Sequence, residues 1–148
     1  MIDTPVILQT KPQLTAVIRL TIPREEMRTV MGPALSELHA AVKATGPWFT
    51  RHFKMEPKIF DFEVGVPVAA PVKPSGRVLN AELPAMSVGR AVLRGSYEQL
   101  ASAWPELDAW IVAQGRKPGP SLIETYVVDP GTNPDSSAWR TELTRPLL

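Results

Sequence analysis

Two stretches in the second half of the chain, GPSLIETYVVDP at 119–130 and WRTELTRPLL at 139–148, decide the fold. Both have counterparts in the first half, GPWFTRHF at 46–53 and KIFDFEVGVPV at 58–68. The matched positions keep their order: Gly46-Pro47 with Gly119-Pro120, Phe60 with Trp139, Glu63 with Glu142, and Pro67 with Pro146. A longer loop at 128–137 accounts for the one change in spacing. The chain is therefore predicted to contain a tandem repeat.

Each half also carries the pattern of a strand before these stretches. Leu14–Ile22 is rich in β-branched residues and Met86–Leu93 is its counterpart, so both predict β-strands. Alternation within 58–68 puts the apolar side chains on one face and Asp61 and Glu63 on the other. We expect Glu63 and its counterpart Glu142 to face solvent.

A helix is predicted between the strands of each half. Its apolar positions recur every three or four residues, as an amphipathic helix requires: Met31, Leu35, Leu38 and Val42, then Leu100, Trp104, Leu107 and Ile111. Pro33 suits a first helical turn, and Gly46 and Gly115 suit C-terminal stops.

The predicted fold is α+β, a tandem strand–helix–strand–strand repeat. The repeats cover about 10–68 and 81–148, and a proline-rich linker at 69–80 joins them. Each unit alone would expose one sheet face, so residues 1–148 are predicted to form a single domain. We expect pseudo-two-fold symmetry, with antiparallel sheets around a central ligand groove.

Composition excludes several classes of function. The 148 residues are 44% hydrophobic and 21% charged, which argues against disorder, and the net charge of +1 does not favour nucleic-acid binding. The absence of cysteine excludes thiolate chemistry and cysteine-based metal sites, and two histidines are too few for a histidine metal site. Phosphate-binding glycine loops are absent, so we expect no metal and no cofactor.

The chain shows neither a signal peptide nor an apolar run long enough to span a membrane. A cytoplasmic location without membrane association is the default expectation. His39 is predicted to be a partly exposed helix residue. His52 lies in an aromatic run, and a structural role is favoured for it over a place in the lining of a site.

Glu124 is the strongest candidate for chemistry. Alternation puts Leu122, Glu124 and Tyr126 on one strand face, and we expect the helix to cover the other face, which carries Ile123. Glutamate is disfavoured in strands and almost never fully buried without a partner, so Glu124 either faces solvent or points into a pocket. A carboxylate among aromatic side chains would suit a hydrophobic cation, or a general acid/base acting on an apolar substrate.

The tandem repeat, Glu-x-Tyr-x-x-Asp-Pro at 124–130, and Trp-Arg-Thr-Glu-Leu at 139–143 with Pro146 resemble the GyrI-like (gyrase-inhibitor-like) small-molecule-binding family over residues 10–148. In many AraC-type and multidrug-responsive regulators this is the effector-binding domain, built from strand–helix–strand–strand (SHS2) repeats. The resemblance implies an aromatic groove between the repeats with the strand glutamate at its floor. In the family's regulators that carboxylate meets lipophilic cations, and some stand-alone members resemble hydrolases of cyclopropane-containing natural products.

The resemblance assigns Glu124 the place of the family glutamate and Tyr126 that of its tyrosine, as ligand-binding and, in an enzyme, catalytic residues. Ile123 stands where family members often carry an aromatic residue. Four further aromatic residues are candidates for the groove lining: Trp48, Phe53, Tyr97 and Trp104.

Three functions remain open at this point. The first is a binding module for an amphipathic, aromatic or cationic small molecule, as in multidrug binding. The second is a cofactor-free hydrolase that uses Glu124, and the third is a gyrase-interacting modulator. Because the predicted domain starts within about ten residues of Met1, we expect a stand-alone module that does not itself bind nucleic acid. The oligomeric state is left open.

Overall fold

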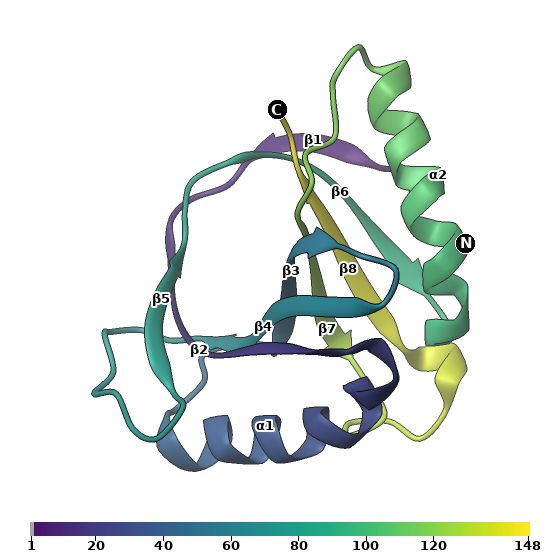
Figure 1. The fold of residues 1–148 in the computed structure, drawn as a ribbon. Coiled ribbons are helices and arrows are strands. Elements are labelled where there is room, and N and C mark those ends of the chain that lie inside the picture. The colour runs from purple at the N-terminus through teal and green to yellow at the C-terminus, as the bar shows by residue number, and fades with distance from the viewer. Residues whose placement is uncertain (1) are drawn as a thin grey trace. The chain divides into compact units, whose positions relative to one another are not determined.

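The computed structural model describes residues 2–148, apart from the side chains of Lys54 and Met55. The chain is α+β with antiparallel strands, as the sequence predicts (Figure 1). It divides into two compact units, the first-repeat unit, Lys11–Ala85, and the second-repeat unit, Met1–Thr10 with Met86–Leu148. Among the described residues, neither α-helix combines the length and the apolar character that crossing a membrane requires.

The first-repeat unit packs one helix on an antiparallel sheet. Its elements in chain order are β2 (Gln13–Pro23), a 3-10 turn (Arg24–Glu26), α1 (Met27–Ala41), β3 (Phe49–Met55), β4 (Ile59–Pro67) and β5 (Leu79–Leu83). The strand order is β3-β4-β2-β5. The apolar face of β4 packs with Ile18 of β2 and with Ala34 and Leu38 of α1.

The second-repeat unit has the same construction. Its elements are β1 (Val6–Gln9), β6 (Ser87–Arg94), a 3-10 turn (Tyr97–Gln99), α2 (Leu100–Ala113), β7 (Leu122–Val128), a second 3-10 turn (Ser136–Ala138) and β8 (Arg140–Pro146). The strand order is β7-β8-β6-β1. In Figure 1, α2 runs alongside β6 of the same unit.

The two units share one strand topology. In each unit the strand before the helix (β2 or β6) pairs with β4 or β8, and the same β4 or β8 pairs with the strand after the helix (β3 or β7). The match extends to irregularities, since β3 is bulged between His52 and Lys54 and β7 between Tyr126 and Val128. Two edge strands were not predicted, β5 beside β2 and β1 beside β6. The arrangement of both repeats as one domain stays a prediction.

The predicted start and end of α1 are wrong, whereas the predicted end of α2 at Gly115 is confirmed. Pro33 lies inside α1 rather than in its first turn, because the 3-10 turn at 24–26 starts the helix earlier. The helix ends at Ala41, where Val42 turns extended, so Gly46 is not its stop. Gly115 does end α2: with φ +76° it donates to Val112 O, and Arg116 N–H donates to Ile111 O, forming a Schellman motif.

The expectation that Glu63 faces solvent is wrong. Its exposed fraction is 6%, and Arg51, its cross-strand neighbour on β3, places Nη1 3.8 Å from Glu63 Oε1. Burial raises the pKa of Glu63, while the nearby Arg51 and Arg19 lower it. Its counterpart Glu142 is more open, with 29% of its side chain exposed and Oε1 3.4 Å from Arg90 Nε.

The helix α2 covers the face of β7 that carries Leu122, whereas the sequence predicted that it covers the face that carries Ile123. Leu122 packs in the core of the second-repeat unit with Leu107 and Ile111 of α2. Glu124 pairs across the strands with Leu143, a member of the same core. Both faces of β7 carry similar numbers of apolar residues, so alternation alone did not decide which face meets the helix. Glu124 and Tyr126 therefore lie on the α2 side.

Candidate functional site

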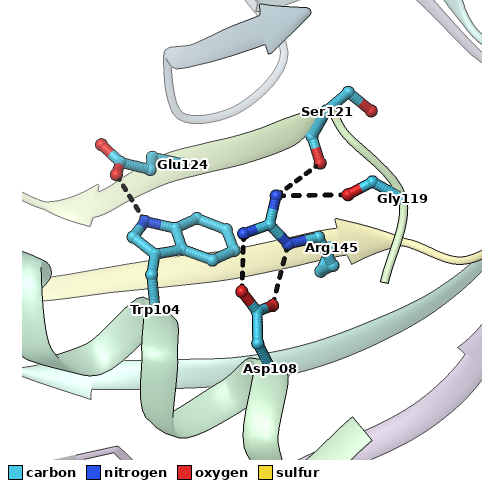
Figure 2. Close-up of polar contacts among 6 residues, drawn as sticks. All are labelled: Trp104, Asp108, Gly119, Ser121, Glu124 and Arg145. Atoms are coloured by element: carbon cyan, nitrogen blue, oxygen red, sulfur yellow. Dashed lines mark hydrogen bonds and ion pairs between the residues drawn. The ribbon is translucent and has the colours of Figure 1, made fainter. Parts of the chain in front are cut away.

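The carboxylate of Glu124 is held by two neutral hydrogen-bond donors. Trp104 of α2 donates from Nε1 to Oε2 at 2.8 Å (Figure 2), and Tyr126 of β7 donates from its hydroxyl to Oε1 at 2.7 Å. Among the side chains that the structure describes, no ion pair involves Glu124. Its negative charge is therefore oriented by neutral groups and left without a cationic partner there.

This environment changes the proton affinity of the carboxyl group. Burial raises the pKa of Glu124, because a low-dielectric surrounding disfavours the charged form. The hydrogen bonds from Trp104 and Tyr126 act in the opposite direction, since they stabilise the carboxylate. Burial is the larger effect, so Glu124 holds a proton more tightly than an exposed glutamate does.

Aromatic rings continue outward from the carboxylate within the same unit. The rings of Tyr126 and Tyr97 meet edge to face, with centroids 5.7 Å apart and an interplanar angle of 73°. Tyr97 also packs against Trp139, with centroids 5.1 Å apart and an angle of 33°. The three rings offer both faces and edges to a flat or bulky apolar group beside the charge.

A turn at Gly95 and the long loop before β8 position the rings of Tyr97 and Trp139. Gly95 follows β6 with φ +115°, a conformation that disfavours side chains, and directs the chain into the 3-10 turn that begins at Tyr97. Gly95 N–H donates to Trp139 O at 3.1 Å. The indole Nε1 of Trp139 donates to Asn133 O in the loop before β8, at 2.8 Å. The loop that lengthens the second repeat therefore fixes an aromatic side chain of the site.

Two polar groups near these rings have unused hydrogen-bonding capacity. Tyr97 OH and Thr141 Oγ1 are buried without a hydrogen-bond partner in the described part of the chain, and Thr141 is the cross-strand neighbour of Tyr126. Burial, with the charges of Asp129 and Glu124, raises the pKa of Tyr97 to about 12, so its hydroxyl stays protonated. Unpartnered buried polar groups are rare, so these two hydroxyls are available to a polar group of a ligand.

A surface hollow adjoins Tyr97 in the chain. Its volume is about 360 Å³, and it is lined by Arg94, Gly95, Ser96, Gln99, Ser136 and Ser137. Among the described residues, no group of three or more histidine, aspartate or glutamate side chains is placed to hold a metal ion.

Four of the six predicted site residues come together in the second-repeat unit: Glu124, Tyr126, Tyr97 and Trp104. The other two belong to the first-repeat unit. Trp48 packs against the core of that unit, and the ring of Phe53 lies 4.0 Å from the guanidinium of Arg19. Their role as ligand contacts, and the groove between the repeats, stay predictions.

Sequence reasoning missed Trp139 and Arg145. Trp139 was recognised as the repeat counterpart of Phe60 and as part of the Trp-Arg-Thr-Glu-Leu motif, but not as a site residue, and its place directly after the long loop was the available signal. Arg145, whose guanidinium centre lies 4.9 Å from the ring centroid of Trp104, gave no signal of its own. His52 is structural, as expected: it is buried and stacks on Phe62, and burial, with the charge of Arg24, lowers its pKa to about 4.

Solved structures with the same fold include two of EcmrR. The chain aligns with the EcmrR C-terminal domain at a TM-score of 0.84 and 20% identity, covering 98% of this chain and 97% of that one. In the complex of EcmrR with DNA, the chain covers only 57% of the length of EcmrR, at a TM-score of 0.83 and 21% identity.

Two more distant structures share the fold. One is SAV2435 bound to tetraphenylphosphonium, with a TM-score of 0.70, 11% identity and coverage of 99% and 94% of the two chains. The other is a hydrolase from Listeria innocua, with a TM-score of 0.67, 9% identity and coverage of 97% and 91%. No match was found among curated proteins.

The sequence matches the family described as GyrI-like small molecule binding domain over residues 5–148. This match covers both repeats and every residue of the site around Glu124. The chain belongs to the GyrI-like small molecule binding domain family.

Proposed function

We propose that the protein binds an amphipathic cation with aromatic or bulky apolar groups, and that Glu124 neutralises the positive charge. The observation that carries this proposal is a partly buried carboxylate held by two neutral donors, with no cationic partner among the described side chains. A cation supplied by the ligand would compensate this charge in surroundings where water screens it weakly.

The aromatic residues would contact the body of the ligand. Tyr97 and Trp139 extend the aromatic surface outward from Tyr126, which favours both burial of apolar groups and cation–π attraction. The unpartnered hydroxyls of Tyr97 and Thr141 would serve any polar group that the ligand carries.

Calorimetric titration with tetraphenylphosphonium tests the proposal, a probe suggested by its presence in the structure of SAV2435. We expect saturable binding that weakens at least about thirtyfold in Glu124→Gln, because truncating one partner of a buried charge pair typically costs about 2–5 kcal/mol. Glu142→Gln, a change of the same chemistry on β8 of the same unit, should leave the affinity unchanged.

The uncharged analogue triphenylphosphine oxide provides a further control. It should bind more weakly than the cation to the parent protein and equally well to Glu124→Gln. Equal affinity of the parent and Glu124→Gln for tetraphenylphosphonium would contradict the proposed role of Glu124.

A second candidate is a cofactor-free hydrolase of strained cyclopropane compounds. The raised pKa of Glu124 favours it, because a carboxyl group that keeps its proton to a higher pH than usual can act as a general acid. In such a reaction a ring C–C bond breaks, one carbon takes the proton and the other takes hydroxide from water, which returns a proton to Glu124.

Incubation with a reactive cyclopropane compound separates the two candidates. Product that is lost in Glu124→Gln would favour the enzyme. Saturable binding without product would favour the binding module.

A further inference from the structure

Arg145 is a buried cation on β8, with an exposed fraction of 9%. Its Nε and Nη2 donate to Oδ1 and Oδ2 of Asp108, each at 2.9 Å, in a bidentate pair. Nη1 donates to the backbone oxygen of Ser121 at 3.1 Å and makes a longer contact of 3.5 Å with that of Gly119 (Figure 2). Its planar group is therefore fixed from two sides.

The same guanidinium packs on the indole that serves Glu124. Its central carbon lies 4.9 Å from the ring centroid of Trp104. Figure 2 shows Trp104 between Arg145 and Glu124, with its Nε1 directed at the carboxylate. Asp108, Arg145, Trp104 and Glu124 thus form a continuous series of contacts.

This series of contacts connects α2, β7 and β8, the three elements around Glu124. Asp108 lies one helical turn after Trp104 on α2, so their side chains share a helix face. Arg145 comes from β8, and the carbonyl of Ser121 directly precedes β7, which carries Glu124. The guanidinium of Arg145 therefore contacts both Trp104, which donates to Glu124, and the backbone at the start of β7, the strand that carries Glu124.

A cation stacked on an indole has two electrostatic consequences. It covers that ring face and repels a second cation that approaches there, and it draws electron density from the ring, which strengthens the N–H as a donor. Both favour Trp104 as a hydrogen-bond donor over Trp104 as a surface for a cationic ligand.

We infer that Arg145 and Asp108 are positioning residues, which fix Trp104 as a donor to Glu124 and leave cation contacts to Tyr97, Tyr126 and Trp139. This inference rests on the proposed function of Glu124 and changes one expectation from the sequence. Trp104 acts on the ligand through the carboxylate rather than as part of the aromatic wall.

The first test uses the ligand-free protein. The indole N–H resonance of Trp104, assigned with Trp104→Phe, reports its hydrogen bond by chemical shift and by hydrogen exchange. In Arg145→Met and in Asp108→Ala we expect it to move toward the position of a solvent-exposed indole and to exchange at least about tenfold faster, as expected when a closed contact opens locally. Arg90→Met, which breaks the ion pair with Glu142 in the same unit, is the matched control and should leave the resonance in place.

The second test follows tetraphenylphosphonium affinity against pH. The bond from Trp104 lowers the pKa of Glu124, so its loss raises that pKa. Cation binding needs the carboxylate, and the pH midpoint of binding should therefore move upward in Arg145→Met and Asp108→Ala. Combining Arg145→Met with Trp104→Phe should shift the midpoint no further than Trp104→Phe alone.

An unmoved indole resonance in folded Arg145→Met or Asp108→Ala would overturn the inference, as would additive midpoint shifts in the double variant. Asp108, with 33% of its side chain exposed, provides a second variant should Arg145→Met fail to fold. If the parent protein bound no cation, the proposed function would fail, while the indole resonance would still decide whether the pair positions Trp104.

Discussion

At the scale of single residues, Glu124 combines two opposed influences on one carboxyl group. Burial disfavours its charge, and the donors Trp104 and Tyr126 orient and partly stabilise it. A ligand cation would complete this stabilisation, whereas in its absence a proton competes for the same oxygens. The residue is consequently better suited to a replaceable partner than to a permanent structural one.

The substitution Glu124→Gln should leave the folded state intact at neutral pH. The glutamine oxygen can accept from Trp104 Nε1 while its amide donates to the Tyr126 oxygen, so both contacts of Glu124 keep a partner. Because the folded pKa of Glu124 is raised, the charged side chain costs stability at pH values above its unfolded pKa of about 4.5.

We therefore expect a melting temperature for Glu124→Gln equal to or above that of the parent at pH 7. The difference should vanish below about pH 4, where the parent carboxyl is protonated in both states. Thermal unfolding followed by circular dichroism across this range measures it. A large decrease at pH 7 would show that the charge of Glu124 has a structural role.

At the scale of elements, the two repeats share a framework but differ at the site positions. Val64 pairs with Thr50 as Leu143 pairs with Glu124, and Phe62 pairs with His52 as Thr141 pairs with Tyr126. The first-repeat unit therefore lacks a carboxylate where the second carries Glu124. The two units thus differ in the side chains of the strand after the helix and not in topology.

Two exposed glycines, one inside α1 and one at the end of α2, give a prediction about stability. Gly32, inside α1, would accept a Cβ without a contact within 4 Å outside its chain neighbours, but Pro33 follows it, and proline disfavours the helical conformation of a preceding residue that carries a Cβ. Gly32→Ala should therefore gain less than the usual alanine advantage of about 0.5–1 kcal/mol. Gly115 is equally open but has φ +76°, so Gly115→Ala should destabilise the protein by about 1–2 kcal/mol.

Denaturant titration of both variants measures these changes. A stabilising effect of Gly115→Ala would contradict the assignment of Gly115 to a left-handed helix end. Since a Cβ at Gly115 meets no atom within 4 Å outside its chain neighbours, packing does not complicate this interpretation.

At the scale of the whole molecule, regular features of the sequence were the predictable ones. The repeat, the strand from Leu14 and the role of Gly115 followed from spacing and glycine chemistry, and Glu124 with Tyr126 followed from alternation and resemblance. The buried state of Glu63 was missed because its partner Arg51 lies on another strand. The Asp108–Arg145–Trp104 series was missed for the same reason, since it exists only once α2 and β8 are packed together.

The near-neutral charge of the chain leads to a prediction about salt. With a net charge of +1 at pH 7, attraction of a cation rests on the local carboxylate rather than on the field of the whole protein. Raising the ionic strength from about 0.05 to about 0.5 M should weaken tetraphenylphosphonium binding less than about tenfold, because partly buried charges are screened less than exposed ones. Calorimetry at these two salt concentrations measures the change, and a loss of a hundredfold would indicate further ionic contacts.

The first edge strand has a consequence for the order of folding during synthesis. β1 is made before every other strand, yet it pairs only with β6, through contacts such as Gln9 with Ser87. All of the first-repeat unit, Lys11–Ala85, leaves the ribosome between these two partners. The first-repeat unit can fold while the second is incomplete. The segment Val6–Gln9 can pair only after β6, which follows that unit in the chain, has been translated. Residues Val6–Gln9 are thus expected to gain their hydrogen bonds to β6 later than the first-repeat unit gains its own.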